Sequence, residues 1–179
     1  MKKMLLCAGI LCSAGVLSAA DFRIDVGGER DKVELEVKEC SEKIRSSPAG
    51  WLNERKNQRL VFIGAASDQW EKKSISFVPK SNGNVNVCLM GTINKPGAPH
   101  LGYDDIKVNG KLLKNGSFEE GSGDRIANWS GWGKAARIAG GAADGNQYVL
   151  ANHVDALVQS IPVKAGEKVT ITFQVKNGK

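Results

Sequence analysis

The chain has few of the usual signs of acid-base or nucleophilic catalysis, since neither of its histidines has a visible partner in the sequence. His100 and His153 are its two histidines, and no nucleophile motif such as G-x-S-x-G accompanies them. The 19 acidic residues could supply the two opposed carboxylates of a glycosidase, so a small hydrolase is one open interpretation. Four carboxylates are the candidates for a functional role: Asp104, Asp105, Glu119 and Asp144. The alternative is that they are solvated groups at strand ends.

Aromatic residues in polar, glycine-rich sequence offer a second kind of chemistry, which is stacking on sugar rings. Polysaccharide binding needs flat aromatic faces and planar polar side chains on a rigid sheet or its loops. Trp129 and Trp132 lie in the glycine-rich segment 121–145, and each is a candidate platform or, alternatively, a plug of the fold's edge. Trp70 precedes a strand-like segment and is expected in the core. The further candidates for sugar contact are Trp51, Tyr103 and Tyr148.

The start of the chain has the three parts of a signal peptide. Lys2 and Lys3 are basic, residues 4–17 are apolar and uncharged, and small residues precede Asp21. We therefore expect residues 1–20 to be a cleaved signal and residues 21–179 to form one exported domain, secreted or periplasmic, without a membrane span. A lipoprotein processed at Cys12 is the alternative.

The charge of the exported part bears on nucleic-acid binding, and its cysteines bear on a disulfide. The formal net charge is +6 for the whole chain and falls by two when Lys2 and Lys3 leave, so no nucleic-acid partner is expected. Of the four cysteines, Cys40 and Cys88 remain outside the signal. An oxidising compartment favours a disulfide between them, with two buried thiols as the alternative.

Strand-like alternation of apolar and polar residues dominates the rest of the chain. Asn82-Gly83 and Asn109-Gly110 are each expected to make a tight hairpin turn. Many short strands separated by glycine-rich loops predict an all-β sandwich or jelly roll. The clearest apolar segments lie in residues 33–37, 60–63, 75–77, 85–89 and 169–175.

Several motifs resemble the carbohydrate-binding modules of the families numbered four, nine and twenty-two, which are galactose-binding-like jelly rolls. Residues 115–119 match the opening N-G-x-F-E strand of those modules, and a tryptophan follows. Residues 145–148 match their G-N-x-Y strand. Residues 158–161 match their V-x-Q-x-I strand, and residues 164–173 match a K-A-G-E-K turn that leads into a T-x-T-F strand.

The second half of the family pattern comes first in this chain. Trp70 and the segments 76–78, 83–91 and 103–106 resemble the later strands, which close on Y-D-D-I. The reversed order predicts a circularly permuted jelly-roll β-sandwich, with a fragment of two adjacent modules as the alternative. The hairpin at Asn109-Gly110 favours permutation, because it would fold the family's last strand back onto its first.

The resemblance also implies a function and an ion. It implies a module that binds polysaccharide without catalysis, and a structural or adhesion module contacting protein is the alternative. In the resembling modules a calcium ion joins the first strand to the last, which implies ligands from Glu119 and from Asp104 or Asp105. Backbone carbonyls near Ser117 and Asp144 would complete the set.

Overall fold

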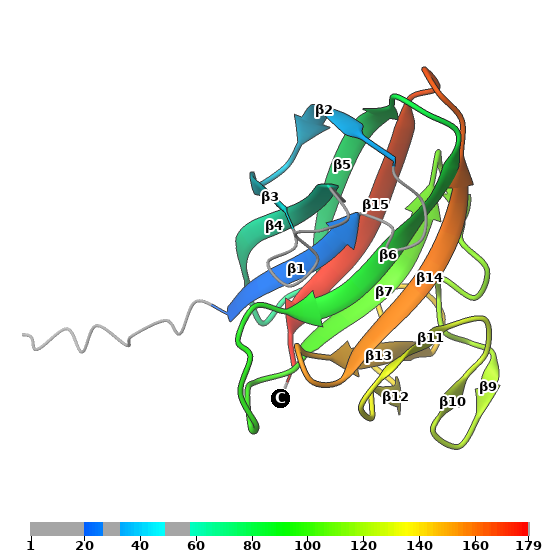
Figure 1. Cartoon of the computed structure of the whole chain (residues 1–179). Helices are drawn as coiled ribbons and strands as arrows, with labels where there is room; N and C mark the ends of the chain where they lie inside the picture. The colour runs from blue at the N-terminus through cyan, green and yellow to red at the C-terminus, as the bar shows by residue number, and fades with distance from the viewer. Residues whose placement is uncertain (1–19, 27–32, 49–57, 179) are drawn as a thin grey trace, which may run out of the picture.

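The computed structural model describes residues 20–26, 33–48 and 58–178, which form antiparallel strands joined by turns (Figure 1). Trp51 and residues 1–19 of the expected signal lie outside this part of the chain. Across the three described segments, no helix is long and apolar enough to cross a membrane. The predicted all-β class is confirmed.

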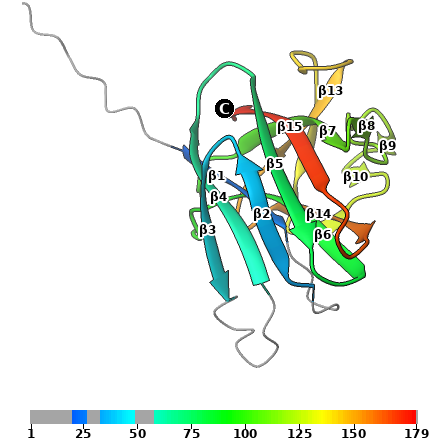
Figure 2. The same ribbon diagram turned by 90° about the horizontal axis from the view of Figure 1, so that it is seen from above.

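Two large sheets form the layers of a sandwich (Figure 2). In spatial order, the six-stranded sheet consists of β11 (Ser130–Trp132), β14 (Ala156–Val163), β6 (Gly83–Gly91), β1 (Ala20–Val26), β4 (Gln58–Ala66) and β3 (Lys43–Pro48). The seven-stranded sheet has the order β12 (Ala136–Ala139), β13 (Gln147–Ala151), β7 (Leu101–Val108), β15 (Val169–Asn177), β5 (Glu71–Pro79) and β2 (Leu35–Cys40), and β8 (Lys111–Leu112) pairs with β7. A separate small hairpin consists of β9 (Gly121–Ser122) and β10 (Arg125–Ile126).

Aromatic side chains join the two sheets inside the sandwich. The ring of Phe22 on β1 meets the ring of Phe173 on β15 edge to face, with 5.8 Å between centroids. Tyr103 on β7 lies 6.3 Å from the same Phe173 ring. All three side chains are buried, and burying each contributes on the order of 1.5–3 kcal/mol. The predicted alternation is confirmed along β15, where Val169, Ile171, Phe173 and Val175 are buried.

The two expected hairpin turns have different outcomes. Asn109 and Gly110 have φ angles of 51° and 77° and join the paired strands β7 and β8, so this hairpin is confirmed. The hairpin at Asn82-Gly83 is wrong, because β5 and β6 belong to opposite sheets. The Asn82 Oδ1 instead accepts a hydrogen bond from the backbone N–H of Ala165, in the neighbouring connection from β14 to β15.

The structure does not contain the predicted disulfide between Cys40 and Cys88. Cys40 ends β2 in the seven-stranded sheet, and Cys88 lies on β6 in the six-stranded sheet. Both side chains are half-buried, and burial raises the pKa of the Cys40 thiol.

Candidate functional site

Trp132 is the exposed tryptophan of the described residues and is held in one orientation. Its side chain is 46% exposed at the edge of the six-stranded sheet. The indole Nε1–H donates a hydrogen bond of 2.9 Å to the carbonyl of His153. One edge of the ring is therefore anchored while much of its surface faces solvent, which is the arrangement that stacking on a sugar ring requires.

Two glycines bring the strand that carries Trp132 close to its neighbour. A Cβ atom on Gly131 would lie 1.9 Å from the carbonyl oxygen of Ala156. Gly133 has a φ angle of 72°, and a Cβ atom there would lie 2.1 Å from the carbonyl oxygen of Val154. The sequence Gly131-Trp132-Gly133 thus allows a close approach that places the only side chain of the three at the surface.

Asp155 fastens the end of this segment. Its Oδ1 accepts a hydrogen bond of 2.7 Å from the backbone N–H of Lys134, and its Oδ2 lies 3.1 Å from His100 Nε2. These contacts, the Lys134 N–H first, hold the pKa of Asp155 below its usual range although burial opposes them. The carboxylate is therefore ionised at neutral pH and ties the Trp132 segment to the turn before β14.

A cavity of about 210 Å³ lies beside Trp132, and we call it the Trp132 cavity. Arg125 and Asp124, from the β9–β10 hairpin, are among the residues that line it, and both have planar charged side-chain groups. Ser130 and Lys134 also line it, and the Ser130 hydroxyl donates a hydrogen bond to the Val158 carbonyl. The cavity combines an exposed indole with planar polar groups, which are the two features that sugar recognition uses.

Trp129 is not an exposed platform, and that interpretation is corrected. Its side chain is 9% exposed and packs on Phe118, with 5.4 Å between ring centroids. Its indole Nε1–H donates a hydrogen bond of 2.9 Å to the carbonyl of Asn115. Trp129 therefore closes the edge of the sandwich, which is the alternative to a sugar platform. It also lines the Trp132 cavity.

The N-G-x-F-E segment builds the turn that receives this plug. The Asn115 side-chain amide donates to the carbonyls of Glu120 and Ala127, and its Oδ1 accepts from the Glu120 N–H. A Cβ atom on Gly116 would lie 2.4 Å from the Ile106 carbonyl oxygen, so this position requires glycine. The motif therefore has a structural role in this chain.

Tyr103 is also excluded as a sugar-stacking residue. Its ring is fully buried, and its hydroxyl donates a hydrogen bond of 2.7 Å to the Met90 carbonyl. The strand that carries Tyr103, β7, lies between β13 and β15 inside the sheet. The inward face of an interior strand is covered by the opposite sheet.

A second aromatic cluster lies on the outer face of the seven-stranded sheet. Tyr148 is half-buried there and meets Trp70 edge to face, with 5.3 Å between centroids. The Lys176 Nζ lies 4.3 Å from the Tyr148 ring centroid and 4.4 Å from that of Trp70. Trp70 is half-buried and donates its indole N–H to the Gly141 carbonyl, so it is not the core residue we expected. Tyr148 and Trp132 belong to opposite sheets and do not share a site.

Asp104 and Glu119 hold the middle and the end of one segment, residues 140–147. The Asp104 Oδ2 accepts hydrogen bonds from the backbone N–H groups of Ala143 and Asp144, at 2.8 and 2.9 Å. The Glu119 Oε1 accepts from Asn146 and Gln147, both at 2.8 Å. The sequence motifs that contain these two acids are thus brought to the same loop, where backbone N–H groups meet the carboxylates.

Asp104 and Asp105 have different surroundings, because a β-bulge at this point interrupts the pairing of β7 with β15. The register with β15 shifts between Thr172 and Gln174, and Asp105 has a φ angle of 51°. Asp104 is fully buried, and this burial raises its pKa to about 6 although backbone N–H groups oppose the shift. Asp105 instead forms an ion pair of 2.8 Å with Lys107.

The remaining expected calcium ligands lie near the same loop or turn. Ser117 is half-buried in the N-G-x-F-E turn, and Asp144 is exposed in the loop that Asp104 holds. Calcium takes 6 to 8 oxygen ligands. In the part of the chain that the structure describes, no three histidine, cysteine or acidic residues form a group that could hold a metal. The calcium ion therefore stays a prediction.

Comparison with known proteins identifies no relative: the chain matches no protein-family model, no curated protein and no solved structure.

Proposed function

We propose that this protein is an exported module that binds carbohydrate at the Trp132 cavity and has no chemistry of its own. The observation that carries the proposal is the exposed, anchored indole of Trp132 beside the planar charged groups of Arg125 and Asp124. A sugar ring can stack on the indole through its C–H groups while its hydroxyls pair with the planar groups. The sequence resemblance to carbohydrate-binding modules supports the same class of ligand.

The size of the cavity favours one sugar unit of a longer chain. A volume of about 210 Å³ lies below the roughly 300–1,000 Å³ of pockets that enclose a whole small molecule. An extended polysaccharide would place one unit on Trp132 and continue over the surface. On this proposal the fold is a circularly permuted jelly roll, to which the confirmed hairpin at Asn109-Gly110 lends support.

The exposed apolar residues give less support to a protein-binding module. Apart from Trp132, the large exposed apolar side chains of the described residues are Val37, Ile93 and Leu112. They come from β2, from the segment after β6 and from β8, rather than from one element. Large contiguous apolar patches are a common mark of surfaces that dock protein.

Retention of the exported chain on immobilised polysaccharides tests the proposal. We expect the Trp132→Ala variant to lose most of its retention while its melting temperature stays within a few degrees of that of the wild type. Tyr148→Ala is the matched control, because it removes an aromatic ring from the other sheet and should preserve retention. A wild-type protein that no glycan retains would refute the proposal.

A further inference from the structure

A second cavity lies next to the Trp132 cavity, along the edge of the six-stranded sheet. This second cavity, of about 730 Å³, shares Arg125, Trp129 and Ser130 with the first. It continues past Leu113 and Lys114 to Pro162. The two cavities therefore adjoin, and we call them together the β14 groove.

The length of β11 explains why this groove exists. β11 pairs only with residues 156–158 of β14, whereas β14 continues to Val163. Among the described strands, none pairs with the outer edge of β14 beyond Val158. The second cavity, lined by residues 158–162, thus follows the uncovered half of this strand.

The walls of the β14 groove are anchored to the sheet. The Gln159 side-chain amide on β14 is buried and donates to the carbonyls of Lys114 and Asn128, at 3.0 and 2.9 Å. The Arg137 guanidinium donates to the Gly121 carbonyl and so holds the hairpin that carries Arg125. The groove is therefore preorganised, which limits the ordering cost of binding.

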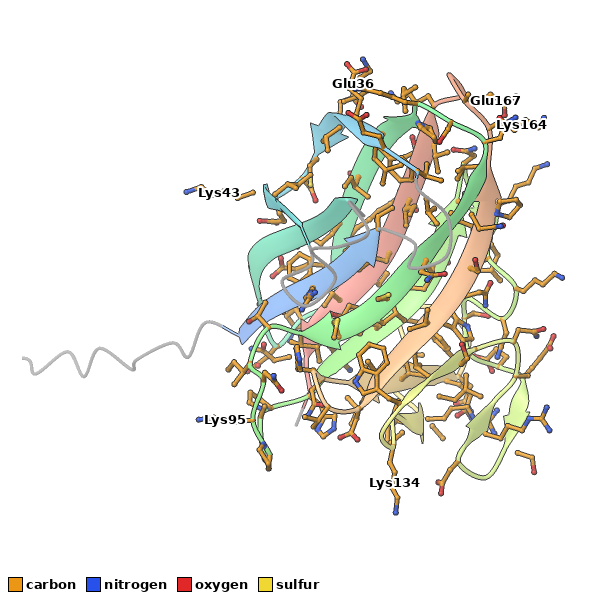
Figure 3. The ribbon with its side chains drawn as sticks, viewed as in Figure 1. Glu36, Lys43, Lys95, Lys134, Lys164 and Glu167 are labelled. Carbon is orange, nitrogen blue, oxygen red and sulfur yellow. The ribbon has the colours of Figure 1, made fainter. Side chains whose placement is uncertain are left out.

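The charged residues that line the groove are mostly cationic. Lys134, Arg125 and Lys114 follow one another along it, and Asp124 is its single acid. Lys134 and Lys164 lie toward opposite ends of β14 (Figure 3), and the charge of Lys164 is offset by its ion pair with Glu167 at 3.4 Å. Three cations against one anion leave an excess of positive charge along the groove.

We propose that the ligand of the β14 groove is an acidic polysaccharide, bearing carboxylate or sulfate groups. This inference rests on the proposed carbohydrate-binding function and specifies its ligand. One sugar unit stacks on Trp132, and anionic groups on the following units meet Arg125 and Lys114. Arginine suits this role, because its planar guanidinium pairs with both oxygens of a carboxylate or sulfate.

Calorimetric titration of the exported chain with oligosaccharides of equal length tests the proposal. The ligands are an oligogalacturonate, its carboxyl-reduced neutral counterpart, a sulfated oligosaccharide and a single-stranded oligonucleotide. We expect an acidic sugar to bind more tightly than the neutral one and to lose affinity as salt rises, because salt screens exposed charges. Whichever acidic sugar binds more tightly identifies the anionic group.

Charge-removing variants locate the binding. Lys114→Gln and Arg125→Gln should each weaken binding of the acidic sugar by about two- to tenfold, the range for exposed and charge-assisted pairs. Lys43→Gln on β3, at the far edge of the same sheet, and Lys95→Gln remove the same charge elsewhere and should have no effect. Melting curves check that every variant is folded.

The outcomes separate this inference from the proposed function. If the neutral sugar binds as tightly as the acidic ones, the inference fails and carbohydrate binding stands. Equal losses in the control variants, or tighter binding of the oligonucleotide, would also overturn it. If none of the sugars binds, both proposals fail.

Discussion

Tyr103 on β7 donates its hydroxyl hydrogen to the carbonyl oxygen of Met90 on β6, with 2.7 Å between the two oxygens. The two strands belong to opposite sheets, so this hydrogen bond crosses the interior of the sandwich. The backbone N–H of Arg23 on β1 donates to the same hydroxyl at 3.4 Å. One buried side chain thus connects three strands and satisfies backbone groups that water does not reach.

We expect Tyr103→Phe to lower the free energy of unfolding by about 1–3 kcal/mol, because the Met90 carbonyl would lose its buried donor. Denaturant titration monitored by fluorescence measures this change. Tyr148→Phe is the control and should cost less than about 0.5 kcal/mol, since the half-buried ring keeps its contacts with Trp70 and Lys176. Equal losses in the two variants would contradict the assigned role of Tyr103.

Trp129→Ala should destabilise the fold by about 3–5 kcal/mol, the range for truncating a buried aromatic residue. The change removes the contact with Phe118 and the hydrogen bond to Asn115. The same truncation at the exposed Trp132 should cost much less. A Trp129→Ala variant as stable as the wild type would show that this ring does not plug the sandwich edge.

Asp104 should make the protein less stable as the pH rises from about 4 to 6. Its pKa is raised from 3.8 to about 6 in the folded state, so the folded protein holds this proton more tightly than the unfolded chain does. The stability that protonated Asp104 contributes to the folded state is fully present below pH 3.8. It is lost as the pH rises through the folded-state pKa of about 6. The loss amounts to about 3 kcal/mol, at 1.36 kcal/mol for each unit of pKa.

Unfolding free energies of wild type and Asp104→Asn, measured from pH 3.5 to 7.5 in chelator, check this prediction. The difference between the two proteins should change across pH 4 to 6, because asparagine does not titrate. A constant difference would show that Asp104 has an ordinary pKa.

The calcium prediction is tested by the melting temperature. We expect chelator to lower the melting temperature and added calcium to restore it, since an ion between Glu119 and Asp104 would stabilise the loop that they hold. Glu119→Gln should abolish the response, whereas Glu120→Gln, at the adjacent exposed position, should preserve it. If metal-free protein melts at the same temperature in chelator and in calcium, the calcium site is contradicted. The backbone N–H groups are then the partners of these two acids.

The strands were predictable because alternation is a local property. Val169 to Val175 alternate with polar residues in the sequence, and the same apolar set is buried in β15. Asn109-Gly110 was predictable for a similar reason, since both residues adopt positive φ angles that this dipeptide tolerates. Asn82-Gly83 has the same local chemistry, but the strands on its two sides joined different sheets.

The candidate site was only partly predictable. The sequence by itself determined the all-β class, the candidate aromatic residues and the acids of the two motifs. Trp129 and Trp132 lie three residues apart in similar sequence, yet one is buried and the other exposed. Only the tertiary structure decided this, because burial depends on what packs against a side chain: Phe118 covers Trp129, while Trp132 lies at an open sheet edge. Strand order likewise decided three further features: the separation of Cys40 from Cys88, the burial of Tyr103 and the groove along β14. Strand order is set by contacts between segments far apart in the chain.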